Sequence, residues 1–100
     1  MSHTQHATSQ VARLIPLGQL VATPHALALL EKAKLSTFAI FARHEQGDWG
    51  DVDIDDAMAN EQALIDGGRL MSVYKLEIGT VWVITEADRS ATTLLLPEEY

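Results

Sequence analysis

The fold class is decided by one stretch, Leu70-Met71-Ser72-Val73-Tyr74-Lys75-Leu76-Glu77-Ile78-Gly79-Thr80-Val81-Trp82-Val83-Ile84-Thr85. Its first half alternates, with Leu70, Ser72, Tyr74 and Leu76 on one face, as in a half-buried strand. A turn at 77–79 separates it from a second strand over 81–85, and a turn at 87–90 leads to a third over 91–96. Connections this short join antiparallel neighbours, so the sequence predicts a meander that ends at Pro97.

Upstream of the meander, capping residues and spacing predict helices. Thr23 and Pro24 fit the N-cap and first position of a helix over 24–34. Ser36 can cap a second helix that ends near His44 and Gly47. The segment 36–41 also has the β-propensity of a strand, and we favour the helix because of its C-terminal signals.

A third helix begins after Asp53 or Asp55, runs to about Asp66 and stops at Gly67-Gly68. Its residues Ile54, Met58 and Ile65 share one face. A short edge strand is expected around 19–22. The predicted class is therefore α+β, with two to three N-terminal helices followed by a three- or four-stranded antiparallel meander.

Composition narrows the class of protein. The 100 residues, 47% of them hydrophobic, suffice for one domain, which we place at 13–100 behind a polar, disordered tail at 1–12. The absence of cysteine excludes disulfides, thiolate zinc sites and cysteine nucleophiles. No apolar run approaches the length of a membrane span, and the first residues lack a signal-peptide core. We expect a cytoplasmic protein without membrane contact.

Charge indicates the kind of partner. The formal net charge is −7, from 14 acidic and 7 basic residues. Phosphate backbones repel such a chain, so nucleic acid is disfavoured and a basic protein is the expected partner. Between residues 45 and 66 the chain carries no Lys or Arg, and its acidic residues there are Glu45, Asp48, Asp51, Asp53, Asp55, Asp56, Glu61 and Asp66.

Part of this acidic segment resembles a calcium loop. Asp51, Asp53 and Asp55 are spaced like the first, third and fifth positions of an EF-hand loop. The match then fails, because Asp56 stands where the turn needs glycine and Gln62 where the loop needs a bidentate glutamate. Caps and first-turn residues of a helix explain the carboxylates better. Divalent-cation binding stays an alternative, and no metal or cofactor is assigned.

Two polar segments contain the remaining candidates. Trp49, between glycines, is expected to fold back onto the core and pin its loop, while the alternative is a pocket beside His44. In the segment 85–93, ordinary turn and strand chemistry accounts for most residues. The alternative there is an anion site built from Arg89, Ser90 and a threonine hydroxyl.

Three motifs carry a family resemblance. They are Arg43-His44-x-x-Gly47-Asp48-Trp49-Gly50-Asp51, Asn60-x-x-Ala63-Leu64-x-x-Gly67-x-Arg69-Leu70 and Thr85-Glu86-Ala87-Asp88-Arg89-Ser90. From about residue 17 to its end, the chain resembles an uncharacterised family of small proteins carried on bacterial plasmids and integrative elements. The resemblance implies a mobile-element context and transfers no catalytic residue.

Small bacterial RNase-type folds offer a looser analogy, since they also place helices before an antiparallel sheet. The analogous catalytic set here is His44, Arg89, Ser90 and Thr92. The net charge of −7 counts against it, because such nucleases need a basic face.

The sequence thus leaves three functions open. The leading hypothesis is a non-enzymatic acidic interaction protein that binds a basic partner, with candidate binding residues Asp48, Trp49, Asp51, Asp53 and Asp55. The alternatives are an RNase-like hydrolase and a cation-binding module. The last strand, at 91–96, is also considered as an exposed edge through which a homodimer could pair across a two-fold axis.

Overall fold

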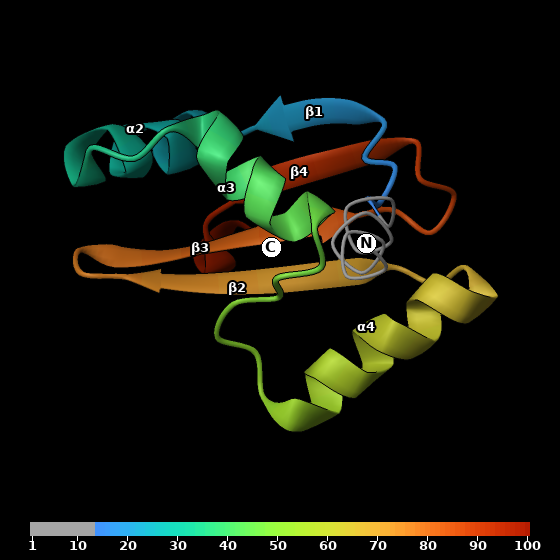
Figure 1. Ribbon diagram of the computed structural model, residues 1–100. Coiled ribbons are helices and arrows are strands. Elements are labelled where there is room, and N and C mark those ends of the chain that lie inside the picture. Colours follow the sequence, from blue (N-terminus) through green and yellow to red (C-terminus); the bar gives the residue numbers. More distant parts are fainter. Residues whose placement is uncertain (1–13) are drawn as a thin grey trace, which may run out of the picture.

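The computed structural model describes residues 14–100 and confirms the α+β prediction (Figure 1). The predicted tail at 1–12 lies outside the described residues. In chain order the elements are β1 (Gln19–Ala22), α2 (Pro24–Ala33), α3 (Thr37–Glu45), α4 (Ile54–Asp66), β2 (Leu70–Leu76), β3 (Gly79–Thr85), β4 (Ala91–Leu95) and the short 3₁₀ helix η1 (Pro97–Glu99).

Each of the three helices starts at a side-chain cap. The Thr23 hydroxyl accepts the Ala26 N–H at 3.2 Å, which confirms the predicted start of α2. Ser36 caps α3, so the ambiguous segment after it is the helix we favoured. Asp53 caps α4, because its carboxylate accepts the Asp56 N–H at 2.8 Å. Capping oxygens satisfy N–H groups that a helix cannot pair internally.

The sheet has the strand order β1-β4-β3-β2. The pairs β2–β3 and β3–β4 are antiparallel, as predicted, while β1 runs parallel to β4. The last strand is therefore interior, and the prediction that it forms an exposed edge is wrong. Burial of Thr92 and Leu94 on one face and of Leu95 on the other fits this interior position.

Helices α2 and α3 cover one face of the sheet, whereas α4 lies alongside β2 (Figure 1). The main apolar core fills the space between α2, α3 and the sheet and comprises Ala26, Leu30, Ile40, Phe41, Tyr74, Val81, Val83 and Leu94. A second cluster near α4 contains Ile15, Trp49, Ala63 and Leu70. The side chain of Leu17 packs against both clusters.

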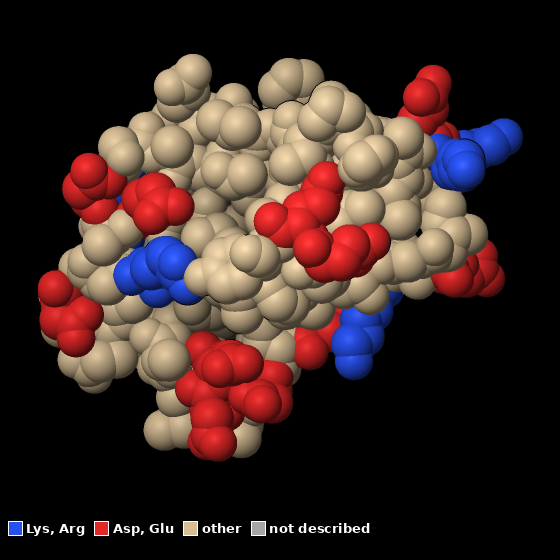
Figure 2. Space-filling model, turned by 180° about the vertical axis from the view of Figure 1, so that it is seen from behind, with Lys and Arg blue, Asp and Glu red and all other residues tan. Residues whose placement is uncertain are grey.

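On the opposite face of the sheet, η1 lies against β3, and no α-helix among residues 14–100 covers that face (Figure 1). Seen from behind, the surface is mostly tan, with separate clusters of acidic side chains (Figure 2). There the Tyr100 ring meets Trp82 edge-on at 5.5 Å, and Arg69 lies over Tyr100 and donates to its hydroxyl. No helix of the described part is long and apolar enough to cross a membrane.

Candidate functional site

His44 lies in the last turn of α3 and has no exposed surface. Its Nδ1 lies 2.6 Å from the Ser72 hydroxyl of β2, and its Nε2 lies 2.8 Å from the Thr85 hydroxyl of β3. The Thr85 hydroxyl is 2.7 Å from that of Thr92 on β4, whose proton goes to the carbonyl of Leu17 at 2.8 Å. We call this connected set the polar chain.

The direction of each hydrogen bond in the polar chain follows from counting protons, because a hydroxyl has only one to donate. Thr92 donates to the Leu17 carbonyl, so it must accept from Thr85. Thr85 has then used its proton and accepts from Nε2–H of His44. The count therefore places a proton on Nε2, and in a neutral ring Nδ1 is then bare and accepts from Ser72.

Electrostatics agree with a neutral ring. Burial lowers the pKa of His44 to about 4, and the positive charge of Arg89 adds to the effect. The ring also meets Trp49 edge-on, with 5.8 Å between centroids. A substrate cannot reach a fully buried imidazole, so this geometry does not favour general acid–base catalysis by His44.

The side chain of Arg89 is also engaged in hydrogen bonds within the domain. It adopts a left-handed backbone with φ of 61°, and its guanidinium donates to the carbonyls of Gly68 at 2.6 Å and of Ala63 at 3.2 Å. It thereby pairs carbonyls at the C-terminal end of α4, where a cation also suits the helix dipole. Ser90 sits in the exposed turn beside it, and its N–H bonds Asp88 at 2.9 Å. His44, Arg89, Ser90 and Thr92 thus form no open anion pocket.

The loop before α4 is held from several sides. The Asp48 carboxylate accepts from Nε of Arg43 at 2.7 Å, which lowers the pKa of that carboxyl. The backbone carbonyl of Asp48 accepts the Tyr74 hydroxyl at 2.7 Å. Trp49 is buried, as predicted, and its indole N–H donates to Glu61 at 3.0 Å. Asp48 and Trp49 therefore pin the loop to the domain.

The same loop shields the outer edge of β2. The Val73 N–H donates to the Trp49 carbonyl at 3.0 Å, and Asp51 supplies an N–H to the Val73 carbonyl and a carboxylate to the Lys75 N–H. Gly50 is required here, because with its φ of 73° any Cβ would lie 2.1 Å from the Val73 carbonyl oxygen. From α4, Asn60 bonds both backbone groups of Met71. We call the edge of β2 that these contacts cover the guarded edge.

Of the predicted binding set, Asp53 is the α4 cap and Asp55 lies exposed in the first turn of the helix. Within residues 14–100, no group of three or more His, Asp or Glu side chains lies close enough to hold a metal ion. The aspartates with EF-hand spacing therefore have other roles: Asp53 caps α4, and Asp51 pairs with backbone groups of the guarded edge.

Helix α4 has the opposite orientation to the one its apolar side chains suggest. It contacts the domain through buried Asn60 and Ala63, while the side chains of Ile54, Met58 and Ile65 are 75%, 63% and 79% exposed. Sequence reasoning found the stripe but could not show that it faces solvent. We call these three residues the α4 stripe.

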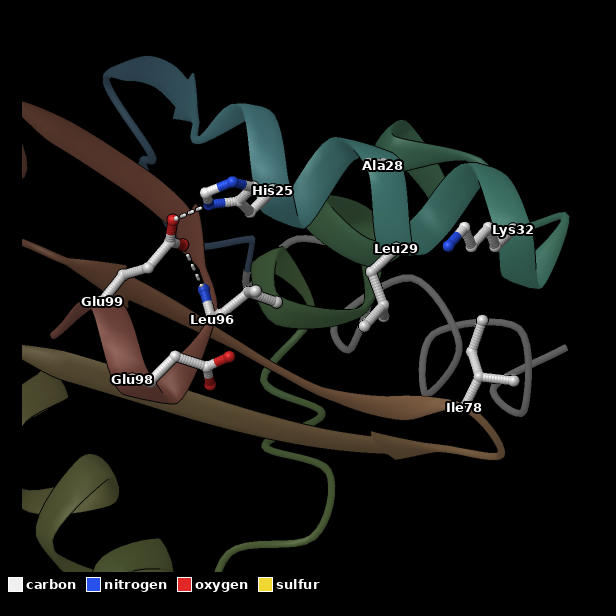
Figure 3. Close-up of a pocket in the computed structure, with 8 residues that line it drawn as sticks. All are labelled: His25, Ala28, Leu29, Lys32, Ile78, Leu96, Glu98 and Glu99. Carbon is white, nitrogen blue, oxygen red and sulfur yellow. Dashed lines mark hydrogen bonds and ion pairs between the residues drawn. The ribbon is translucent and has the colours of Figure 1, made fainter.

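A groove that sequence reasoning missed lies between α2 and η1 (Figure 3). It encloses about 720 Å³, the size of a small-molecule site, with Leu29 and Leu96 among its lining residues. Glu99 closes one end, where its carboxylate accepts from Thr23 and lies 3.1 Å from His25. Hydrogen bonding from the Leu96 N–H lowers the pKa of Glu99. The Glu99 contacts tie the C-terminal segment to α2.

Comparison with known proteins adds no family: no family model, no curated protein and no solved structure matches this chain.

Proposed function

We propose that this protein is an acidic interaction protein of the cytoplasm, and that the outer face of α4 docks a basic protein partner. One observation carries the proposal. The α4 stripe exposes three large apolar side chains on a helix that carries Asp55, Asp56, Glu61 and Asp66 and no Lys or Arg. Exposed apolar side chains gathered on one surface typically mark an interaction site.

The stripe has the geometry of a docking ridge. At 3.6 residues per turn, its three positions fall within about 40° around the helix axis. On the same wheel, Glu61 flanks the stripe on one side, and Asp55 and Asp66 flank it on the other. A partner segment with apolar side chains between Lys or Arg residues would match this pattern of apolar centre and acidic rim.

The two kinds of group have different roles. Burial of the stripe would supply most of the affinity, as apolar anchors do in interfaces that bind through a helix face. The carboxylates would speed association and select basic partners, and salt would screen them. The resemblance to mobile-element proteins supports a partner of the nucleic-acid-processing type, because such enzymes carry basic surfaces.

A defined probe tests the surface directly. We would titrate the protein with a synthetic amphipathic helix of Leu and Lys, and with a control peptide in which Glu replaces Lys. The Lys peptide should bind and weaken at high salt, and the Glu peptide should not bind. Binding should fall at least tenfold in a variant that combines Ile54→Ser, Met58→Ser and Ile65→Ser.

The matched control is Ile78→Ser, which removes an exposed apolar side chain at the β2–β3 turn, away from α4. It should leave binding unchanged. Capture of partners from a bacterial lysate on the wild type and on both variants then extends the test to natural ligands. Equal capture by all three proteins, or none at any salt concentration, would refute the proposal.

A further inference from the structure

The two outer edges of the sheet differ in their protection. The guarded edge of β2 has its backbone groups paired by Trp49, Asp51 and Asn60. The other edge belongs to β1, which pairs only with β4 among the described residues. Proteins normally protect such an edge, because its unpaired N–H and C=O groups invite another strand.

The groups that β1 presents outward can be identified from its bonds to β4. The Gln19 N–H donates to the Ser90 carbonyl, and the Thr23 N–H donates to the Leu94 carbonyl, both at 3.0 Å. Alternate residues of a strand face alternate neighbours, so position 21 also faces β4. The backbone N–H and C=O of Leu20 and Ala22 therefore point away from the sheet.

The side chains of β1 do nothing to discourage pairing. The strand Gln19–Ala22 contains no charge and no proline, although both are common on protected edges. Leu20 is 42% exposed and Val21 is 40% exposed. Leu20 also borders a shallow hollow of about 330 Å³, which is lined mostly by apolar residues, among them the largely exposed Phe38 of α3, and by Glu45.

We propose that two copies of this chain pair through β1, antiparallel across a two-fold axis at Val21. The outward groups are symmetric about that residue, so Leu20 of each copy would pair with Ala22 of the other. Each of these pairs would exchange both of its N–H···O bonds. The two four-stranded sheets would then join into one continuous sheet.

Several features make a second copy the fitting occupant. A two-fold axis perpendicular to the sheet keeps both helical layers on the same side, so the hollow beside Leu20 meets apolar side chains of the partner's strand. Both strands are uncharged, so no like charges face each other along the paired strands, and salt screens the net charge of −7 that each chain carries. The pairing is self-complementary without any insertion or shift of register.

Disulfide cross-linking through an introduced cysteine tests the register. The chain has no cysteine of its own that would interfere. On the axis, Val21 faces its counterpart as a non-hydrogen-bonded pair, with Cα atoms about 4.5 Å apart, within disulfide range. Val21→Cys should give a covalent dimer under mild oxidation, whereas Ile78→Cys, on the exposed β2–β3 turn, should stay mostly monomeric. Equal cross-linking of both variants, or none, would overturn the proposal.

Charge pairing tests the same contact without a covalent bond. Val21→Lys and Val21→Glu each place like charges face to face, so each variant alone should sediment at the mass of one chain. An equimolar mixture should sediment at twice that mass, as should the wild type. A wild type with the mass of one chain at hundreds of micromolar refutes the dimer and leaves the edge to a strand of another protein. A mixture that stays monomeric refutes the register.

Discussion

The interior of this domain has two ends built on different principles. At one end Leu30, Val81 and Leu94 fill space with apolar surface. At the other end the polar chain joins α3 to three strands by directed hydrogen bonds through His44. Both ends are fully buried on the same face of the sheet. Apolar packing stabilises the fold whenever side chains of suitable volume fill the space. A polar chain stabilises it only when its donors and acceptors take one particular arrangement.

The comparison shows what the polar chain contributes. Burial of an imidazole and several hydroxyls costs free energy, which their mutual hydrogen bonds offset. Among the described residues, no buried side-chain nitrogen or oxygen lacks a partner. The gain is specificity, because sliding α3 by one turn would break every hydrogen bond of His44 and leave the hydroxyl groups of Ser72 and Thr85 without their partner.

The largest effect is expected at the apolar end. Leu30→Ala should lower the free energy of unfolding by about 3–4 kcal/mol, because it removes a buried side chain and leaves a cavity. The matched control is Leu27→Ala on the same helix, whose side chain is exposed and which should cost less than about 0.5 kcal/mol. Urea denaturation of both variants measures the difference. A cost below 1 kcal/mol for Leu30→Ala would mean that this end is not tightly packed.

Acid should act selectively on the polar end. The pKa of His44 is about 4 in the fold against 6.5 without it, so below pH 6.5 the unfolded state binds more protons. Stability is then fully present above pH 6.5 and is lost as pH falls toward 4. Between pH 7.5 and 4.5 we expect a loss of about 2.5 kcal/mol from this group.

The control for the acid effect is His44→Gln. This variant is less stable at neutral pH, but its stability should fall by less than that of the wild type between pH 6.5 and 4.5. The part of the loss that remains comes from carboxyl groups such as those of Asp48 and Glu99, whose pKa values are lowered in the fold and which both proteins share. Denaturation curves at several pH values compare the two slopes. If the wild type and the variant show parallel profiles, the ring of His44 is not buried in its neutral form.

A smaller effect should appear at the far end of the polar chain. Thr92→Val keeps the shape but removes the bond to the Leu17 carbonyl and leaves the proton of Thr85 without an acceptor. We expect a loss of about 1.5 kcal/mol. Thr93→Val, on the next position and the opposite face, should change stability by less than about 0.5 kcal/mol. Equal costs at the two positions would show that the polar chain adds nothing.

Local signals predict much of this fold and little of its site. Caps at Thr23, Ser36 and Asp53 and the alternation of β2 act over a few residues, so the sequence reveals them. The parallel pairing of β1 with β4 joins segments about 70 residues apart, and no local pattern encodes it. The meander was therefore predicted correctly, but its last strand was placed at the wrong position in the sheet.

The site was harder for a related reason. Periodicity identifies an apolar stripe on α4 but does not say whether it faces inward, and here the small face with Ala63 and Asn60 does. The polar chain did leave a signal, since Ser72 and Thr85 occupy inward positions of otherwise apolar alternation. A polar residue at such a position needs a buried partner, and His44 was the available one.

The smallest expected effect is the position of a single proton on His44, which is measured without any change in the free energy of unfolding. Long-range proton–nitrogen NMR spectra at neutral pH should show Nε2 of His44 protonated and Nδ1 bare. The opposite tautomer would make Thr85 donate to Nε2. Thr92 already donates to Leu17, so the oxygens of Thr85 and Thr92, 2.7 Å apart, would then face each other without a proton between them. Two acceptors at that distance repel. An Nδ1–H tautomer would therefore contradict the proton arrangement of the polar chain: His44 would still pair with Ser72 and Thr85, but Thr85 and Thr92 would not be hydrogen-bonded to each other.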